Sequence, residues 1–138
     1  MTLEIYTDGG SKGNPGPSAI GIVFVCGGKQ TKTYREDIGI ATNNIAEYTA
    51  VLKALEMVRD IKTEMTSIEN IKVYSDSNLL TNQLMGRFKV KNAKIREIIL
   101  KIRILEQENN VPVIYNYIPR ERNTIADALV NNRYYQSS

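Results

Sequence analysis

Four acidic side chains stand where acids are structurally awkward in this sequence. Asp8 and Asp76 each end a short run of residues that is typical of a strand. Glu47 and Asp127 each interrupt an apolar run that is typical of a helix. A buried or half-buried carboxylate is costly unless it is paired or bound to a metal. Four such acids favour a carboxylate cage for hard divalent cations, of which Mg²⁺ and Mn²⁺ are the candidates.

The composition excludes several other kinds of catalytic site. The chain contains no histidine, so a Ser-His-Asp or Cys-His mechanism is impossible and a zinc site built from His and Cys is excluded. Cys26 is the one cysteine, so the chain has no intramolecular disulfide. The chemistry that remains for a hydrolase is a set of carboxylates that hold magnesium or manganese.

Length, hydropathy and charge set further limits. The 138 residues fit one domain, 1–138, and the apolar run at 19–26 is too short to cross a bilayer. Nothing at the N-terminus resembles a signal peptide, so we expect a cytoplasmic protein. The net charge is only +3, but seven basic residues gather against the single acid Glu97, in a cluster that either attracts a polyanion or forms a solvated helix face. They are Arg87, Lys89, Lys91, Lys94, Arg96, Lys101 and Arg103.

Hydrophobic periodicity and turn signals predict the elements that must position the four acids. Strands are expected at 2–8, 18–26, 30–39, 70–75 and 113–118, and helices at about 43–60, 77–85, 92–109 and 123–135. Asn123 is expected to cap the last helix. This order predicts an α/β fold with a mixed five-stranded sheet, three antiparallel strands followed by two parallel ones, flanked by helices.

The predicted topology brings the four acids to one end of the sheet. A strand, a crossover helix and a next strand imply a parallel pair, so the 70–75 strand should lie beside the first strand. Asp8 and Asp76 then emerge together at the carboxyl ends of neighbouring strands, where ligand sites of open α/β sheets form. Glu47 and Asp127 each lie about one turn into a helix that starts at this end. Two cations about 3.5–4 Å apart would neutralise the four charges and clamp a reacting phosphodiester.

Each acid also has a purely structural interpretation. Asp8 before Gly9 is a common turn pair, and Asn44 with Glu47 has the spacing of a helix capping box. Asp76 can cap the helix predicted at 77–85, and Asp127 can favour the positive end of its own helix. The four structural interpretations would have to hold together, and this coincidence is what favours a shared site.

Four short motifs resemble those of the type 1 ribonuclease H family. They are YTDGGS at 6–11, TNNIAE at 42–47, YSDS at 74–77 and NTIAD at 123–127, in the order and spacing of that family and over nearly the whole chain. The resemblance implies the ribonuclease H-like fold. It also implies an endonuclease that cleaves the RNA strand of RNA/DNA hybrids with two Mg²⁺ or Mn²⁺ ions, leaving 5′-phosphate and 3′-hydroxyl ends.

The resemblance also assigns residues to roles. Its four metal ligands match Asp8, Glu47, Asp76 and Asp127. Its minor-groove and 2′-hydroxyl contacts match Asn14, Asn43 and Asn44, whose amides both donate and accept, although helix capping or turn formation would also favour these residues. Gly9, Gly10 and Ser11 would let the backbone approach nucleic acid closely, or would simply serve a tight turn. The expected phosphate contacts are Lys89, Lys91 and Asn92.

Two departures from the family pattern stand out. Many members carry a histidine in the loop before the last helix, and Arg120 occupies that region here, as in a compact archaeal-like or bacterial-like subgroup. Arginine does not shuttle protons at neutral pH but grips phosphate bidentately, or it is only a solvated loop charge. Second, residues 86–92 form a short basic turn where some relatives insert a basic handle.

The sequence therefore predicts a hybrid-cleaving ribonuclease H, with double-stranded RNA as a further candidate partner, no membrane contact and a monomeric state. Two alternatives stay open. One is a non-catalytic module that binds RNA/DNA hybrid, and the other is a DNA-directed nuclease of the same broad fold, such as a junction resolvase or an integrase-like enzyme.

Overall fold

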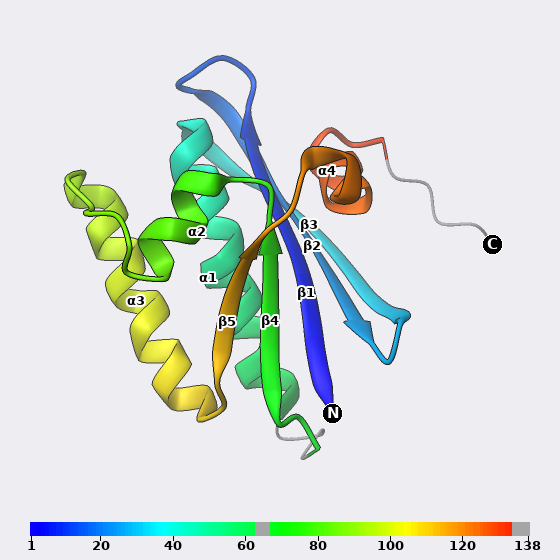
Figure 1. The fold of residues 1–138 in the computed structure, drawn as a ribbon. Helices are drawn as coiled ribbons and strands as arrows, with labels where there is room; N and C mark the ends of the chain where they lie inside the picture. Colours follow the sequence, from blue (N-terminus) through cyan, green and yellow to red (C-terminus); the bar gives the residue numbers. More distant parts are fainter. Residues whose placement is uncertain (63–66, 134–138) are drawn as a thin grey trace.

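A computed structural model describes residues 1–62 and 67–133 of the chain (Figure 1). Its strands are β1 (Thr2–Ser11), β2 (Gly16–Cys26), β3 (Lys29–Ala41), β4 (Asn70–Ser75) and β5 (Val113–Tyr117). Its helices are α1 (Asn43–Lys62), α2 (Asn78–Leu84), α3 (Ala93–Asn109) and α4 (Thr124–Val130), with a 3₁₀ turn at Arg120–Arg122. The element order predicted from the sequence is confirmed.

The five strands form one mixed sheet in the order β3-β2-β1-β4-β5. β1 pairs antiparallel with β2 on one side and parallel with β4 on the other, and β5 continues the sheet parallel to β4. The expected neighbourhood of β1 and β4 is therefore present, because α1 carries the chain from the antiparallel half of the sheet back to β4.

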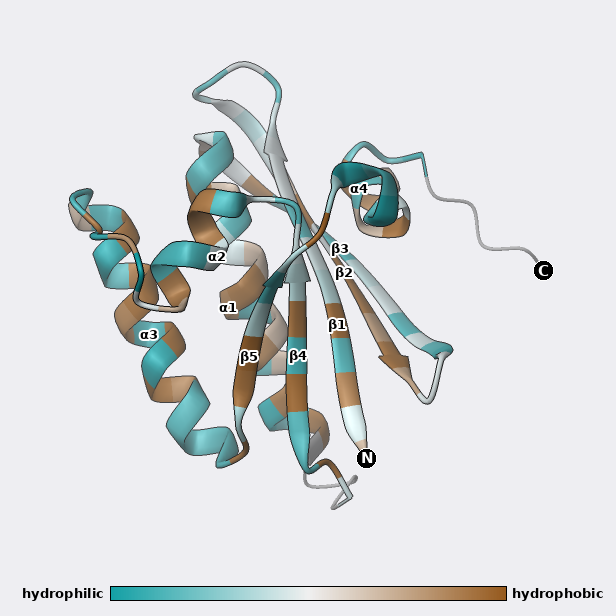
Figure 2. Ribbon diagram, in the orientation of Figure 1, coloured by the Kyte–Doolittle hydropathy of each residue, from teal (hydrophilic) through white to brown (hydrophobic). Residues whose placement is uncertain are grey.

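Helices cover the two faces of the sheet unequally (Figure 1). Figure 2 shows apolar and polar residues alternating along β1 and β4, as period-two side chains must. Leu3 and Ile5 of β1 join the main core with residues of α1 and α3 on one face. On the other face α4 closes a smaller core of Val23, Ala126 and Leu129.

Helix α1 is buried on more than one side. Hydrophobic spacing predicts one apolar stripe on this helix, and four of its six members, Tyr48, Val51, Leu55 and Val58, are fully buried. The other two, Ile45 and Leu52, are half-buried. Ala50 and Ala54, which the stripe did not include, are also fully buried. Because α1 lies between the sheet and α3, small side chains let both neighbours approach closely.

Two predicted element boundaries are wrong. Residues 9–11 continue β1 as a strand instead of opening a loop. The last helix ends at Val130 within the described residues, because Asn132 adopts a left-handed conformation with φ of 56° and stops the helix. The predicted end near Tyr135 lies outside the described residues. No helix in the described part of the chain is long and apolar enough to cross a membrane.

Candidate active site

Three of the four predicted acids lie together at the carboxyl end of the parallel strands. Oxygen atoms of Asp8, Glu47 and Asp76 all lie within 4.8 Å of one another. Asp8 is in the last part of β1, Asp76 directly follows β4, and Glu47 is in the second turn of α1, which starts at the same end of the sheet (Figure 1). We call these residues the acidic triad. Its hard oxygen donors are suited to bind a divalent cation.

Two glycines allow helices to approach the sheet closely enough to form this site. A Cβ atom at Gly9 would lie 2.3 Å from the carbonyl carbon of Ala46, so α1 packs directly on the β1 backbone. A Cβ atom at Gly21 would lie 2.5 Å from the carbonyl oxygen of Ala126, so α4 packs on β2 in the same way. The close packing of α1 on β1 therefore requires glycine at position 9, a requirement that the sequence analysis did not identify. The prediction that it approaches nucleic acid remains untested.

The fourth acid, Asp127, lies beside the triad and is held by arginines. The guanidinium of Arg120 lies 3.5 Å from an Asp127 carboxylate oxygen and 4.0 Å from one of Asp76. Arg133 lies 3.3 Å from the other Asp127 oxygen, and the Asn131 amide donates to the carboxylate at 3.2 Å. The arginine predicted for this region therefore reaches the acids, and it spans two of them.

Burial and repulsion between acids strongly perturb the pKa values of Asp8 and Glu47. Burial, followed by the charges of Asp76, Asp127 and Glu47, raises the pKa of Asp8 from 3.8 to about 8, against a lowering effect of Arg120. Burial also raises the pKa of Glu47 from 4.5 to about 7, opposed first by a hydrogen bond from Ser77. Carboxylates with such pKa values are costly to ionise together without a counter-cation, which is the electrostatic signature expected of a cation site.

Other residues perform the capping roles that the structural interpretations gave to the acids. The Thr42 hydroxyl accepts the Ile45 amide at 3.1 Å and caps α1, so Asn44 lies inside the helix and no capping box with Glu47 forms. The Ser77 hydroxyl caps α2 in place of Asp76. Asp127 does lie in the first turn of its helix, so a favourable helix-terminus interaction accompanies its ion pairs.

The predicted asparagines join the end of β1 to the start of α1. The Asn43 side-chain oxygen accepts the Ser11 amide at 2.7 Å, and the Asn14 side-chain oxygen accepts the Asn43 amide at 3.1 Å. Asn44 is half-buried on α1. A pocket of about 420 Å³ is lined by Asn43 together with Asp8, Glu47 and Asp127, and Arg120 also lines it. Three further residues that the resemblance assigned to nucleic-acid contact also line the pocket: Gly9, Gly10 and Ser11.

The basic turn between α2 and α3 does not line this acidic pocket. Lys89 and Lys91 are exposed, and they form no ion pair within the described part of the chain. Asn92, predicted as a phosphate contact, uses its side-chain oxygen to cap α3 through the Ile95 amide at 3.0 Å. The turn is fixed by Gln83, whose amide donates to the Lys89 carbonyl at 3.0 Å and whose oxygen accepts the buried Tyr48 hydroxyl.

The sequence interpretation missed several residues that shape the site. Gly21 lies within an apolar strand, where an isolated glycine signals a close backbone approach, and this signal was available. Arg133 and Asn131 follow the last helix, and no sequence pattern marks them as partners of Asp127. Arg35, from β3, donates to the Leu129 carbonyl at 2.7 Å and lines the pocket.

The sheet order and the acid cluster at the carboxyl end of β1 and β4 define a ribonuclease H-like α/β protein. Residues 1–134 match the family described as RNase H, and the chain belongs to this family. The family prediction made from the four motifs is therefore confirmed.

Archaeal and bacterial proteins are among the relatives. The chain is 38% identical over 130 residues to a protein named Ribonuclease HI from Halobacterium salinarum, covering 94% of this chain and 62% of the relative. It is 35% identical over 134 residues to the Bifunctional protein Rv2228c of Mycobacterium tuberculosis, covering 96% of this chain and 35% of the relative. The chain thus spans about a third of that mycobacterial relative.

Solved structures agree with the fold. The crystal structure of RNase H1 from Halobacterium salinarum has a TM-score of 0.86 at 35% identity, covering 96% of this chain and 97% of that one. LC11-RNase H1, crystallised in complex with RNA/DNA hybrid, has a TM-score of 0.88 at 38% identity, with 94% of each chain covered.

Proposed function

We propose that this chain is a metal-dependent endoribonuclease that hydrolyses the RNA strand of RNA/DNA hybrids. The observation that carries the proposal is the acidic triad, whose oxygen atoms lie within 4.8 Å of one another at the end of the sheet. Family membership supports the reaction class. The related LC11-RNase H1, crystallised with RNA/DNA hybrid, supports the substrate.

The residues present fit two Mg²⁺ or Mn²⁺ ions. Asp8, Glu47 and Asp76 offer only oxygen donors. Burial, together with the charges of neighbouring acids, raises the pKa of Asp8 and of Glu47, and a bound cation would offset the cost of ionising these two carboxylates. Asp127 completes the proposed ligand set from its position beside Arg120. Two such ions, when bound, supply the Lewis-acid chemistry that stabilises the attacking and leaving oxygens of a phosphodiester.

We propose that the asparagines distinguish RNA from DNA. Asn14, Asn43 and Asn44 would read the minor groove and the 2′-hydroxyl groups, with Gly9, Gly10 and Ser11 against the backbone of the hybrid. The oxygen atoms of Asn14 and Asn43 are already engaged within the protein, which holds both amides in place and leaves their NH₂ groups to donate. Lys89, Lys91 and Asn92 would contact phosphates further along the hybrid.

Arg120 is proposed to grip the phosphate at the reaction centre. Its guanidinium is 69% exposed, so it is accessible to substrate, and it lies against Asp76 and Asp127. An arginine fork stabilises phosphate charge but supplies no proton at neutral pH. The products would carry 5′-phosphate and 3′-hydroxyl ends.

A comparison of substrates tests the proposal. An RNA/DNA hybrid, a DNA duplex and a double-stranded RNA of the same sequence are incubated with the protein and either Mg²⁺ or Mn²⁺. We expect cleavage of the hybrid, with double-stranded RNA cut more slowly or left intact. Binding of the hybrid without turnover in either ion would favour a non-catalytic binding module, and preferential cleavage of the DNA duplex would favour a DNA-directed nuclease. A monomeric state and a cytoplasmic location remain predictions.

A further inference from the structure

Asn123 does not act as the helix cap that its position predicts. It occupies the first position before α4, but its side chain makes no capping hydrogen bond. Instead its amide nitrogen donates to the Thr7 carbonyl at 2.9 Å and to an Asp76 carboxylate oxygen at 3.3 Å. The side chain is therefore turned away from α4 and toward the ends of β1 and β4.

Asn123 lies beside the segments that carry Asp8, Asp76 and Asp127. Thr7 directly precedes Asp8, and Asp76 is a member of the acidic triad. Asp127 follows one helical turn later, and its backbone amide donates to the Asn123 carbonyl at 3.0 Å. The position of Asn123 thus fixes β1, β4 and α4 relative to one another at the point where the acids meet.

Burying the Asn123 side chain in this way lowers the stability of the fold, which is unexpected unless the side chain contributes to the acidic site. Asn123 is 1% exposed, and its side-chain oxygen has no hydrogen-bond partner within the described residues. A buried acceptor without a partner destabilises a fold, and a serine or aspartate here would cap α4 instead. The Asn123 amide donates a hydrogen bond to the Asp76 carboxylate and so holds it in one orientation. A side chain that capped α4 would not make this contact.

We infer that Asn123 is a positioning residue that orients Asp76 and sets the register of the acid-bearing segments before a metal ion binds. The inference rests on the proposed function, because it takes the acids to be metal ligands. Hydrogen-bond partners of metal ligands commonly change metal affinity or activity by about 10–100-fold when they are removed.

The chain offers a matched control in Asn109. This residue is also fully buried at 0% exposure, it also donates to a backbone carbonyl, that of Leu55 at 3.2 Å, and its side-chain oxygen also lacks a partner within the described residues. It lies at the end of α3 and no hydrogen bond joins it to an acid in the described structure. Loss of either amide removes one buried hydrogen bond to backbone, but only Asn123 contacts a carboxylate.

The test measures Mn²⁺ binding to the protein alone by titration calorimetry, for the wild type, Asn123→Ala and Asn109→Ala, at a temperature where circular dichroism shows all three folded. We expect both variants to lose thermal stability. We expect Asn123→Ala alone to bind Mn²⁺ about tenfold more weakly. It should also lower kcat on hybrid while changing KM less than about twofold.

Equal Mn²⁺ affinity in Asn123→Ala and Asn109→Ala would overturn the inference while leaving the proposed function intact. A wild type that binds no Mn²⁺ would overturn both. Should Asn123→Ala fail to fold, Asn123→Leu retains the side-chain volume without the amide, and the same comparison of Mn²⁺ affinity with Asn109→Leu decides.

Discussion

Gly9 and Ala46 lie backbone against backbone at the point where α1 crosses β1. A Cβ atom at Gly9 would stand 2.3 Å from the Ala46 carbonyl carbon and 2.5 Å from the Glu47 amide nitrogen. Because these atoms belong to a helix backbone, they cannot rotate away as a side chain would. This contact brings Glu47 within reach of Asp8, so the acidic triad depends on the absence of one methyl group.

Gly9→Ala should therefore damage both stability and activity. We expect a loss of about 2–4 kcal/mol in the free energy of unfolding, typical of severe overpacking, and at least a tenfold loss of hybrid cleavage because α1 must shift. Guanidinium unfolding and an initial-rate assay measure the two effects. Gly27→Ala is the control: Gly27 has φ of 57° with no atom near its Cβ position, so strain without a clash should cost about 1–2 kcal/mol and leave activity unchanged. Wild-type activity in Gly9→Ala would show that the contact does not set the triad.

The metal-free protein should lose stability as the pH rises from about 4 to about 8. Asp8 has a pKa of about 8 in the folded protein against 3.8 unfolded, so between these values the folded state holds a proton that the unfolded state has lost. The stability that this proton provides is complete below pH 3.8 and gone above pH 8. The difference is on the order of 6 kcal/mol, at about 1.36 kcal/mol for each pH unit.

Denaturant unfolding across this pH range in EDTA measures the slope, and repetition in saturating Mg²⁺ provides the control. Mg²⁺ should flatten the profile, because the cation replaces the proton as counter-charge and binds best to ionised carboxylates. A profile that rises between pH 5 and pH 8 in EDTA would contradict the predicted electrostatics of the triad.

Asp8→Asn should separate activity from stability. The substitution removes a proposed metal ligand and should abolish cleavage, and it also removes the charge whose burial is costly. We therefore expect the metal-free variant to be about 2–4 kcal/mol more stable than the wild type at pH 9. Asp76→Asn should likewise abolish cleavage while the protein remains folded. Near-normal cleavage by either variant would show that the ligands are assigned wrongly.

Arg120→Ala should slow turnover without removing metal binding. We expect kcat to fall by about 10–100-fold through loss of one phosphate contact, with Mn²⁺ affinity retained or increased because a competing cation is gone from Asp76 and Asp127. Arg122→Ala is the control, since Arg122 shares the same exposed 3₁₀ turn and forms no ion pair with an acid in the described structure. If kcat is unchanged in Arg120→Ala, Arg120 is a solvated surface charge with no role in turnover.

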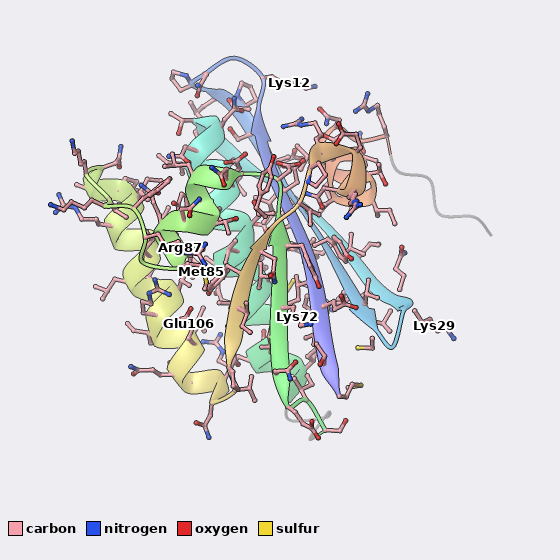
Figure 3. All side chains as sticks on the ribbon, viewed as in Figure 1. Lys12, Lys29, Lys72, Met85, Arg87 and Glu106 are labelled. Atoms are coloured by element: carbon pink, nitrogen blue, oxygen red, sulfur yellow. The ribbon has the colours of Figure 1, made fainter. Side chains whose placement is uncertain are left out.

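The basic turn should contribute to affinity through phosphate contacts alone. Replacing Lys89 and Lys91 with alanine should weaken hybrid binding and reduce the slope of log Kd against log salt by up to about 2. Figure 3 shows Lys29 at the β2–β3 turn, on the opposite side of the molecule from Arg87 of the basic turn. Lys29→Ala is therefore the control of equal charge type, and fluorescence anisotropy on labelled hybrid measures all three proteins. If the slope of log Kd against log salt is unchanged in the double variant, the basic turn does not contact the phosphates of the hybrid.

Local patterns in the sequence were sufficient to predict the sheet and the triad. Alternation and turn residues place Asp8 late in the first strand and Asp76 directly after the fourth, although β1 continues to Ser11. The parallel pairing of β1 with β4 follows from the crossover helix. Together these two inferences bring the carboxylates to one end of the sheet before any coordinates are known.

Features that depend on contacts between distant segments were not predicted. Asn123 reads as a helix cap because its neighbours in sequence form a helix, but its amide nitrogen donates to Thr7 and Asp76, which are remote in sequence. Ala50 and Ala54 read as neutral helix residues, but both are fully buried, because α1 packs between the sheet and α3. Tertiary contacts override local propensity at such positions.

The most direct measurement is cleavage of one RNA/DNA hybrid with both strands labelled, in EDTA, in Mg²⁺ and in Mn²⁺, with the product ends identified. The triad at the sheet end predicts that at least one of the two ions yields RNA fragments with 5′-phosphate and 3′-hydroxyl ends, that the DNA strand stays whole, and that EDTA stops the reaction. An intact RNA strand in both ions, or RNA cleavage that persists in EDTA, would contradict it.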